Sequence, residues 1–107
     1  MQNIVIAEEA YDGDLESYIV ASKGTMLTAI EACVVVSEEP FAPDSGVESW
    51  KMVFENVQYG YRLRQYFYIF RYPGRYFIAS CTVLAEEDAQ LGDLFDTAMK
   101  TFSVREE

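Results

Sequence analysis

The residues that could carry chemistry in this 107-residue chain are carboxylates and thiols, because the sequence contains no histidine. Without an imidazole, the chain has no Ser-His-Asp triad, no Cys-His dyad and no His-containing zinc site. The carboxylates come in close groups, at positions 8–9, 12 and 14, 38–39, 86–88, and 93 and 96. Two carboxylates can act as acid and base, but surface charge is the ordinary role of such groups at element ends and in loops. We predict no catalytic residue, no metal site and no cofactor.

The two cysteines, Cys33 and Cys81, do not form a CxxC pair. Two thiols without histidine are too few ligands for a structural zinc site. No basic residue adjoins either cysteine in the sequence, so nothing local lowers the pKa of its thiol. We interpret both as small buried apolar residues, with a disulfide between them or a reactive thiol as the alternatives.

Aromatic side chains crowd into residues 61–72 and 76–84. Strand alternation places three aromatic residues of the first segment on one face, next to two arginines. An aromatic sheet face that helices leave uncovered is a candidate binding surface, since monomers seldom expose such patches, and Tyr and Arg are favoured at interaction hot spots. Ordinary cross-strand aromatic pairing is the alternative. The predicted binding surface consists of Trp50, Arg62, Arg64, Tyr66, Tyr68 and Phe70.

Eight basic residues stand against eighteen acidic ones, giving a formal net charge of −10. Arginines among aromatic residues also occur on sheets that bind single-stranded nucleic acid, but this charge opposes the neutralisation of phosphates that such binding needs. The first residues lack the basic region of a signal peptide, and no stretch approaches the length of a membrane span. We expect a cytoplasmic protein with no nucleic-acid partner and no membrane insertion.

The elements that position these residues can be predicted from periodicity and turn residues. A single domain over residues 1–107 follows from the length, and half of the residues are apolar. A helix is expected from the N-cap Asp14 to about Ala32, with Gly24 and Thr25 weakening its middle. A second helix follows the carboxylates at 86–88. Strands are expected at residues 3–8, 33–36, 47–58, 61–72 and 76–84.

Turn residues set the connections between these strands. Residues 38–46, with two prolines, are expected to form the longest loop. Gly60 can take the positive φ of a hairpin turn, and Pro73 with Gly74 is typical of a type II turn. The order β-α-β-β-β-β-α predicts an α+β fold in which two helices pack on an antiparallel meander in two layers.

The chain also carries a diffuse resemblance to a known family. Residues 63–70, 74–83, 95–96 and 99–104 read LRQYFYIF, GRYFIASCTV, FD and MKTFSV, and residues 3–6 and 14–18 read NIVI and DLESY. Together these segments, which cover most of the chain, resemble the DcrB-like group of the PsbP-like fold. Compared with that family, we expect the strand pair that usually precedes the first strand to be absent, and residues 40–47 to replace a typical glycine-containing turn.

The resemblance implies a bacterial protein that is not an enzyme. The family includes adaptor chaperones of type VI secretion effectors, which hold hydrophobic transmembrane segments of their clients. We therefore expect a non-enzymatic module that binds a protein or hydrophobic peptide client through the aromatic sheet face. The alternative is a small ligand-binding protein or enzyme with a carboxylate in a pocket between helix and sheet, for example Glu55 beside an arginine.

The first strand predicts self-association. Ile4, Val5 and Ile6 are apolar, and residues 3–7 include no proline and no charge that would protect an open sheet edge. Twofold dimers are the commonest oligomers. We expect a homodimer that buries either this edge or the Tyr66, Tyr68 and Phe70 face, and self-association without any client is a further alternative.

Overall fold

A computed structural model gives the structure of the protein and describes residues 2–29 and 33–102. The described chain is α+β in the predicted order. Its elements are β1 (Gln2–Ala10), α1 (Leu15–Ala29), β2 (Val34–Phe41), β3 (Ser49–Gln58), β4 (Tyr61–Tyr72), β5 (Arg75–Leu84), a short 3-10 helix η1 (Ala85–Glu87) and α2 (Asp88–Lys100).

The five strands form one antiparallel sheet in the order β1-β5-β4-β3-β2. The long strands β3, β4 and β5 form the predicted meander. Both hairpins use two-residue turns in which glycine takes a positive φ, 82° at Gly60 and 73° at Gly74, as the turn residues predicted. Among the described strands, β1 and β2 are the two edges of the sheet.

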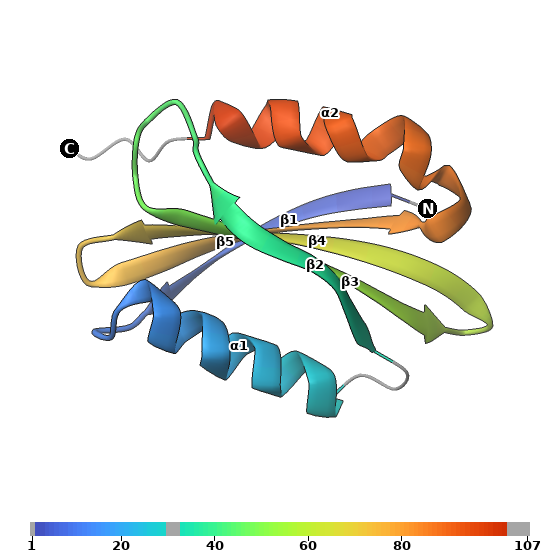
Figure 1. The fold of residues 1–107 in the computed structure, drawn as a ribbon, viewed down its shortest axis with the longest axis horizontal. Helices are drawn as coiled ribbons and strands as arrows, with labels where there is room; N and C mark the ends of the chain where they lie inside the picture. Colours follow the sequence, from blue (N-terminus) through green and yellow to red (C-terminus); the bar gives the residue numbers. More distant parts are fainter. Residues whose placement is uncertain (1, 30–32, 103–107) are drawn as a thin grey trace.

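The helices lie on opposite faces of the sheet, with α2 on one side and α1 on the other (Figure 1). The predicted two-layer arrangement is therefore wrong, and the fold has three layers. The reason lies in the central strands, which are apolar on both faces. Along β4, for example, Tyr68 packs in the cluster beneath α2, and its neighbour Ile69 packs in the cluster beneath α1. Each apolar face therefore needs a helix that shields it from water.

Each face has a compact core. The core beneath α2 consists of Val53, Tyr66, Tyr68, Phe70, Ala79, Cys81, Val83, Phe95 and Met99. The core beneath α1 consists of Leu15, Tyr18, Ile19, Met52, Phe54, Ile69 and Tyr76.

Strand β2 is longer than predicted, since it runs to Phe41 and takes in the first part of the expected loop. Pro40 fits there because an edge strand can turn its missing donor away from the ladder. The register shifts between Val35 and Ser37, which marks a bulge at this edge. Proline and bulge together make β2 a poor template for another strand.

Helix α1 begins as predicted. The backbone N–H of Ser17 donates to Oδ1 of Asp14 at 2.8 Å, so Asp14 is the N-cap. This hydrogen bond is the main reason why the pKa of Asp14 lies below its ordinary value of 3.8. The helix continues through Gly24 and Thr25 without a break, and its expected end at residues 30–32 lies outside the described residues.

The two thiols lie on opposite faces of the sheet and are free. Cys81 is fully buried beneath α2, and this burial raises its pKa to about 11. Cys33 is half-buried at the α1 face, where burial also raises its pKa. The interpretation of Cys81 as a small buried apolar residue is confirmed. The disulfide alternative does not fit, because the sheet separates the two side chains.

The cap at Asp14 generates a prediction for stability. We expect Asp14→Ala to lower the urea midpoint of unfolding at pH 7, and Asp14→Asn to retain most of it, since Asn also caps well. The lowered pKa means that the carboxylate stabilises the fold above about pH 4, and that this contribution disappears as the pH falls through the folded-state pKa. Urea curves from pH 7 to pH 3 should therefore converge for wild type and Asp14→Asn. Parallel curves would contradict a contribution from the Asp14 charge, and an Asp14→Ala variant as stable as the wild type at pH 7 would contradict the cap.

Candidate binding groove beside helix α1

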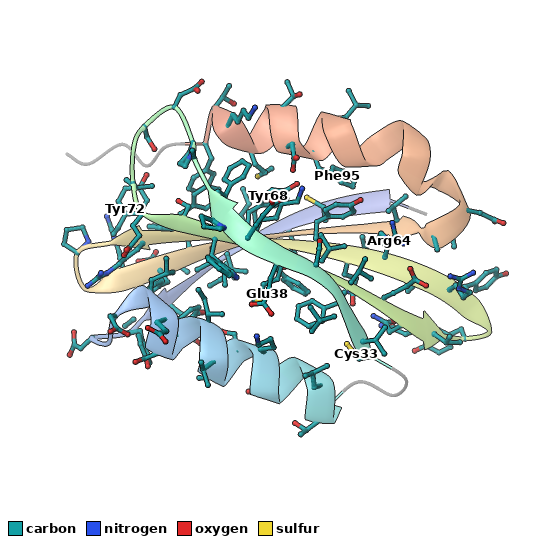
Figure 2. All side chains as sticks on the ribbon, in the orientation of Figure 1. Cys33, Glu38, Arg64, Tyr68, Tyr72 and Phe95 are labelled. Carbon is teal, nitrogen blue, oxygen red and sulfur yellow. The ribbon has the colours of Figure 1, made fainter. Side chains whose placement is uncertain are left out.

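The aromatic face predicted as the binding surface is covered. Tyr66 is 5% exposed, and Tyr68 and Phe70 are 0% exposed. Phe95 of α2 packs on Tyr66, Phe41 packs on Tyr68 and Phe70, and Phe102, just after α2, stacks on Phe70. Figure 2 shows Tyr68 and Phe95 in the layer between the sheet and α2. The expectation that the helices leave this face open is wrong. Periodicity identifies the aromatic face of the strand, but it does not say which helix covers that face.

A polar network fastens α2 over this aromatic face. The Tyr68 hydroxyl donates to Oδ1 of Asp96 at 2.5 Å, and the Lys51 ammonium lies 2.8 Å from the same oxygen. The Lys51 ammonium also lies 5.5 Å from the centre of the Tyr66 ring. Burial, followed by the bond to Asp96, raises the pKa of Tyr68 above its usual range. These contacts join β3, β4 and α2, so they stabilise the cover and leave no open site.

The other predicted surface residues are divided between the two faces. Trp50 is half-buried and packs against the core beneath α1. Arg62 and Arg64 lie at the far end of the α2 face, where they donate to Glu55 at 2.5 and 2.7 Å. Hydrogen bonds from Arg62 and then Arg64 lower the pKa of Glu55. Glu55 thus lies beside arginines, as the alternative hypothesis supposed, but on the α2 face of the sheet.

A groove of about 360 Å³ opens on the opposite face, between α1 and the β1 edge. Its floor is formed by apolar side chains of the sheet, namely Met52, Phe67, Ile69 and Ile78. Met52 and Ile69 are almost completely buried, while Phe67 and Ile78 are half-buried. The alternative hypothesis placed a pocket between helix and sheet, and this groove lies there, although Glu55 is not part of it.

The groove exists because the flank of α1 that faces β1 carries short side chains. Ala21, Ser22 and Thr25 line it from the helix, and their spacing of one and four residues places them on one side of α1. Their short side chains do not reach across to Ala7 on β1. The large residues of the helix, such as Leu15 and Ile19, pack instead over the middle of the sheet. A run of small residues within an apolar helix is the sequence signal that would have predicted the groove.

A polar rim lies where the groove meets the start of α1. Glu9 of β1 lines the groove next to Tyr18 and Ser22 of α1. Burial, followed by a hydrogen bond to the Glu9 carboxylate, raises the pKa of Tyr18 above its usual range. A hydrogen bond with the Ser22 side chain lowers this pKa by a smaller amount. The groove thus combines an apolar floor with one carboxylate and two hydroxyl groups. In the described part of the chain, no three Cys, Asp or Glu side chains are placed to hold a metal ion.

The edge strand β1 continues the groove outward. Within residues 2–29 and 33–102 it pairs on one side only, with β5, so its predicted position at the edge of the sheet is confirmed for this part of the chain. Val5 and Ile6 are each 54% exposed, and Val5 lies on the same strand face as Ala7 and Glu9. The side chain of Ile4 lies outside the description. The apolar surface available on the side of the sheet away from the predicted aromatic face is therefore the groove together with Val5, whereas Ile6 points to the other face.

Comparisons with solved structures identify the fold. A Pseudomonas aeruginosa protein of unknown function, PA94, described as a candidate regulator, aligns with a TM-score of 0.86 at 14% identity over 99% of this chain. The cyanobacterial PsbP of Synechocystis, CyanoP, aligns with a TM-score of 0.62 at 14% identity over 97% of this chain. The chain has a PsbP-like fold. Mycobacterium tuberculosis LpqN, involved in cell envelope biogenesis, aligns with a TM-score of 0.55 at 13% identity over 92%.

The chain spans 74% of PA94, but only 66% of CyanoP and 57% of LpqN. At these identities the likeness concerns the fold alone. No known sequence family and no curated protein matches the chain.

Within the described residues, neither helix combines the length and the apolar character that crossing a bilayer requires.

The network beneath α2 generates a second prediction. We expect Asp96→Ala to lower the free energy of unfolding by about 2 kcal/mol, because it removes the anionic partner of Lys51 and the acceptor of Tyr68. The double variant Lys51→Met/Asp96→Leu should lose less, since it leaves no uncompensated charge. Urea titrations of both variants measure this. Equal losses in the two would show that the ion pair does not fasten α2.

Proposed function

We propose that this protein is a non-enzymatic binding module that holds an apolar segment of a client protein in the groove between α1 and β1. The observation that carries the proposal is the groove itself, an apolar floor left open by the short side chains on this flank of α1. Exposed apolar concavities of this kind commonly mark interaction sites. The resemblance to the DcrB-like group, whose chaperones hold hydrophobic client segments, supports the same class of partner.

We further propose that the module acts as a homodimer joined through β1. Backbone groups alternate in direction along an antiparallel strand. Tyr72 and Arg75 close a two-residue hairpin, so Arg75 and every second residue after it in β5 bond to β4, and the residues between them bond to β1. Those residues pair with the odd-numbered positions of β1. The N–H and C=O groups of Ile4, Ile6 and Glu8 therefore point away from β5, toward the open edge. These groups can pair with the same strand of a second copy. The other predicted dimer surface, the aromatic face, is excluded because α2 covers it.

A twofold axis at Val5 gives the best register for this pairing. It sets Ile4 of one copy opposite Ile6 of the other, so the apolar positions meet at the centre. It also sets Glu8 opposite Gln2, which keeps the carboxylates of the two copies apart. A register centred on Ile6 would instead set Ile4 opposite Glu8. The self-complementary pattern of β1 therefore favours one dimer, with one continuous sheet.

This dimer would join the two grooves. An axis perpendicular to the sheet keeps both α1 helices on the same side of it. The paired β1 strands then form the middle of a trough, bounded by one α1 on each side and floored by the apolar residues of both copies. A trough of this kind offers a long apolar surface, as a client segment requires, from two copies of one short groove.

Filling the groove tests the binding proposal. The probe is a fluorescein-labelled peptide of about 17 leucine and alanine residues with a lysine at each end. We expect Ala21→Trp to weaken its binding at least tenfold in fluorescence anisotropy, because the indole occupies the groove. The control is Leu27→Trp, at an exposed α1 position outside the groove, and it should bind like wild type.

Equal binding by the two tryptophan variants would overturn the groove as the client site. The alternative, a carrier of small molecules, is tested with the neutral fluorophore N-phenyl-1-naphthylamine. Binding of this fluorophore without any binding of the peptide would favour the alternative.

The dimer is tested by sedimentation of two matched variants. We expect the wild type to sediment as a dimer at micromolar concentration, and Ile6→Lys to sediment as a monomer, because the ammonium would be placed at the centre of the β1 pairing. Val57→Lys, at a similarly exposed strand position of β3, should remain dimeric. A wild-type monomer of 12.2 kDa would overturn the dimer, and a dimeric Ile6→Lys would overturn the choice of β1.

A further inference from the structure

We propose that the groove selects apolar segments that carry a basic residue beside the apolar stretch, and that Glu9 receives this basic residue. The inference rests on the proposed function and adds the chemistry of the client. It follows from the position of one carboxylate on an otherwise apolar groove and from the charges around it.

Glu9 is the only charged residue among the described residues that line the groove. It lies on the same face of β1 as Ala7, beside the hydroxyl groups of Tyr18 and Ser22 on α1. The Tyr18 hydroxyl donates a hydrogen bond to the Glu9 carboxylate, but among the described residues no lysine or arginine lines the groove to neutralise its charge. A client lying on the apolar floor would therefore meet an anionic acceptor at this end of the groove. A basic side chain satisfies that acceptor, whereas an acidic side chain would be repelled.

The basic residues of the protein near this end are paired with other carboxylates. Arg71 lies 2.9 Å from Glu48 and Arg75 lies 3.5 Å from Glu8, while Lys23, on the flank of α1 that faces β2, lies 2.6 Å from Glu38. In addition, the formal net charge of −10 favours the approach of a positively charged segment. Both the local and the overall electrostatics thus favour a basic client.

The proposed dimer also gives the spacing of the basic residues. With the twofold axis at Val5, Glu9 lies four residues from the axis in each copy, so the two Glu9 positions are eight residues apart along the strand direction. At about 3.3 Å per residue, this separation is about 26 Å. An apolar helix of about 17 residues has the same length. The trough would therefore suit an apolar helical segment with a basic residue at each end.

The test compares three labelled peptides that share the same 17-residue leucine and alanine stretch and differ in their ends. One has lysine at both ends, one has lysine at a single end, and one has glutamine at both ends. For the wild type we expect affinity to fall about threefold or more with each lysine removed, and this difference to shrink at high salt. Glu9→Gln should lose most of this preference and bind the three peptides with nearly the same affinity, close to that of the wild type for the glutamine peptide.

The matched control is Glu8→Gln. It removes the same charge from the next residue of β1, whose side chain points to the other face and bridges to Arg75. Glu8→Gln should keep the lysine preference. Equal loss of preference in both variants would show that overall charge acts and Glu9 does not, which overturns the inference. Equal wild-type affinity for all three peptides would overturn it as well, while leaving the proposed function intact. Failure of every peptide to bind would overturn both proposals.

Discussion

The structure depends on one constraint, which is that β3, β4 and β5 are apolar on both faces. Phe54 and Ile69 on one face, and Tyr68 and Phe70 on the other, are almost completely buried. A sheet with two apolar faces is stable in water only if both faces are covered. The chain meets this requirement with one helix for each face, and the position of every candidate site follows from how well each helix covers its side.

The two helices differ in how completely they cover their faces of the sheet. Helix α2 is fixed by large apolar residues and by Asp96, which joins it to Lys51 and Tyr68 of the sheet. Helix α1 packs through its first two turns, and then presents short side chains such as Ala21 toward β1. The sheet face with more aromatic residues is therefore closed by α2, and the face under α1, where the helix carries short side chains, keeps an open groove. Aromatic content alone indicates the core here, and a deficit of side-chain volume indicates the groove.

The two sheet edges are also treated differently. Strand β2 carries Pro40 and a bulge, which hinder the addition of another strand. Strand β1 pairs regularly with β5 along its length and exposes Val5 and Ile6. Natural proteins usually protect such an edge or use it. The groove and the open edge adjoin one another, so a single surface is available both for pairing of two copies and for an apolar client.

The sequence by itself determined the α+β class, the order of the elements, the turns at Gly60 and Gly74 and the cap at Asp14, because these depend on local periodicity and on backbone preferences of single residues. The lack of proline and charge in residues 3–7 was also readable from the sequence. Only the tertiary structure decided that the helices lie on opposite faces, that α2 closes the aromatic face, and that the groove lies beside α1. Alternation along a strand states which residues share a face, but which helix reaches that face depends on packing between segments far apart in the chain.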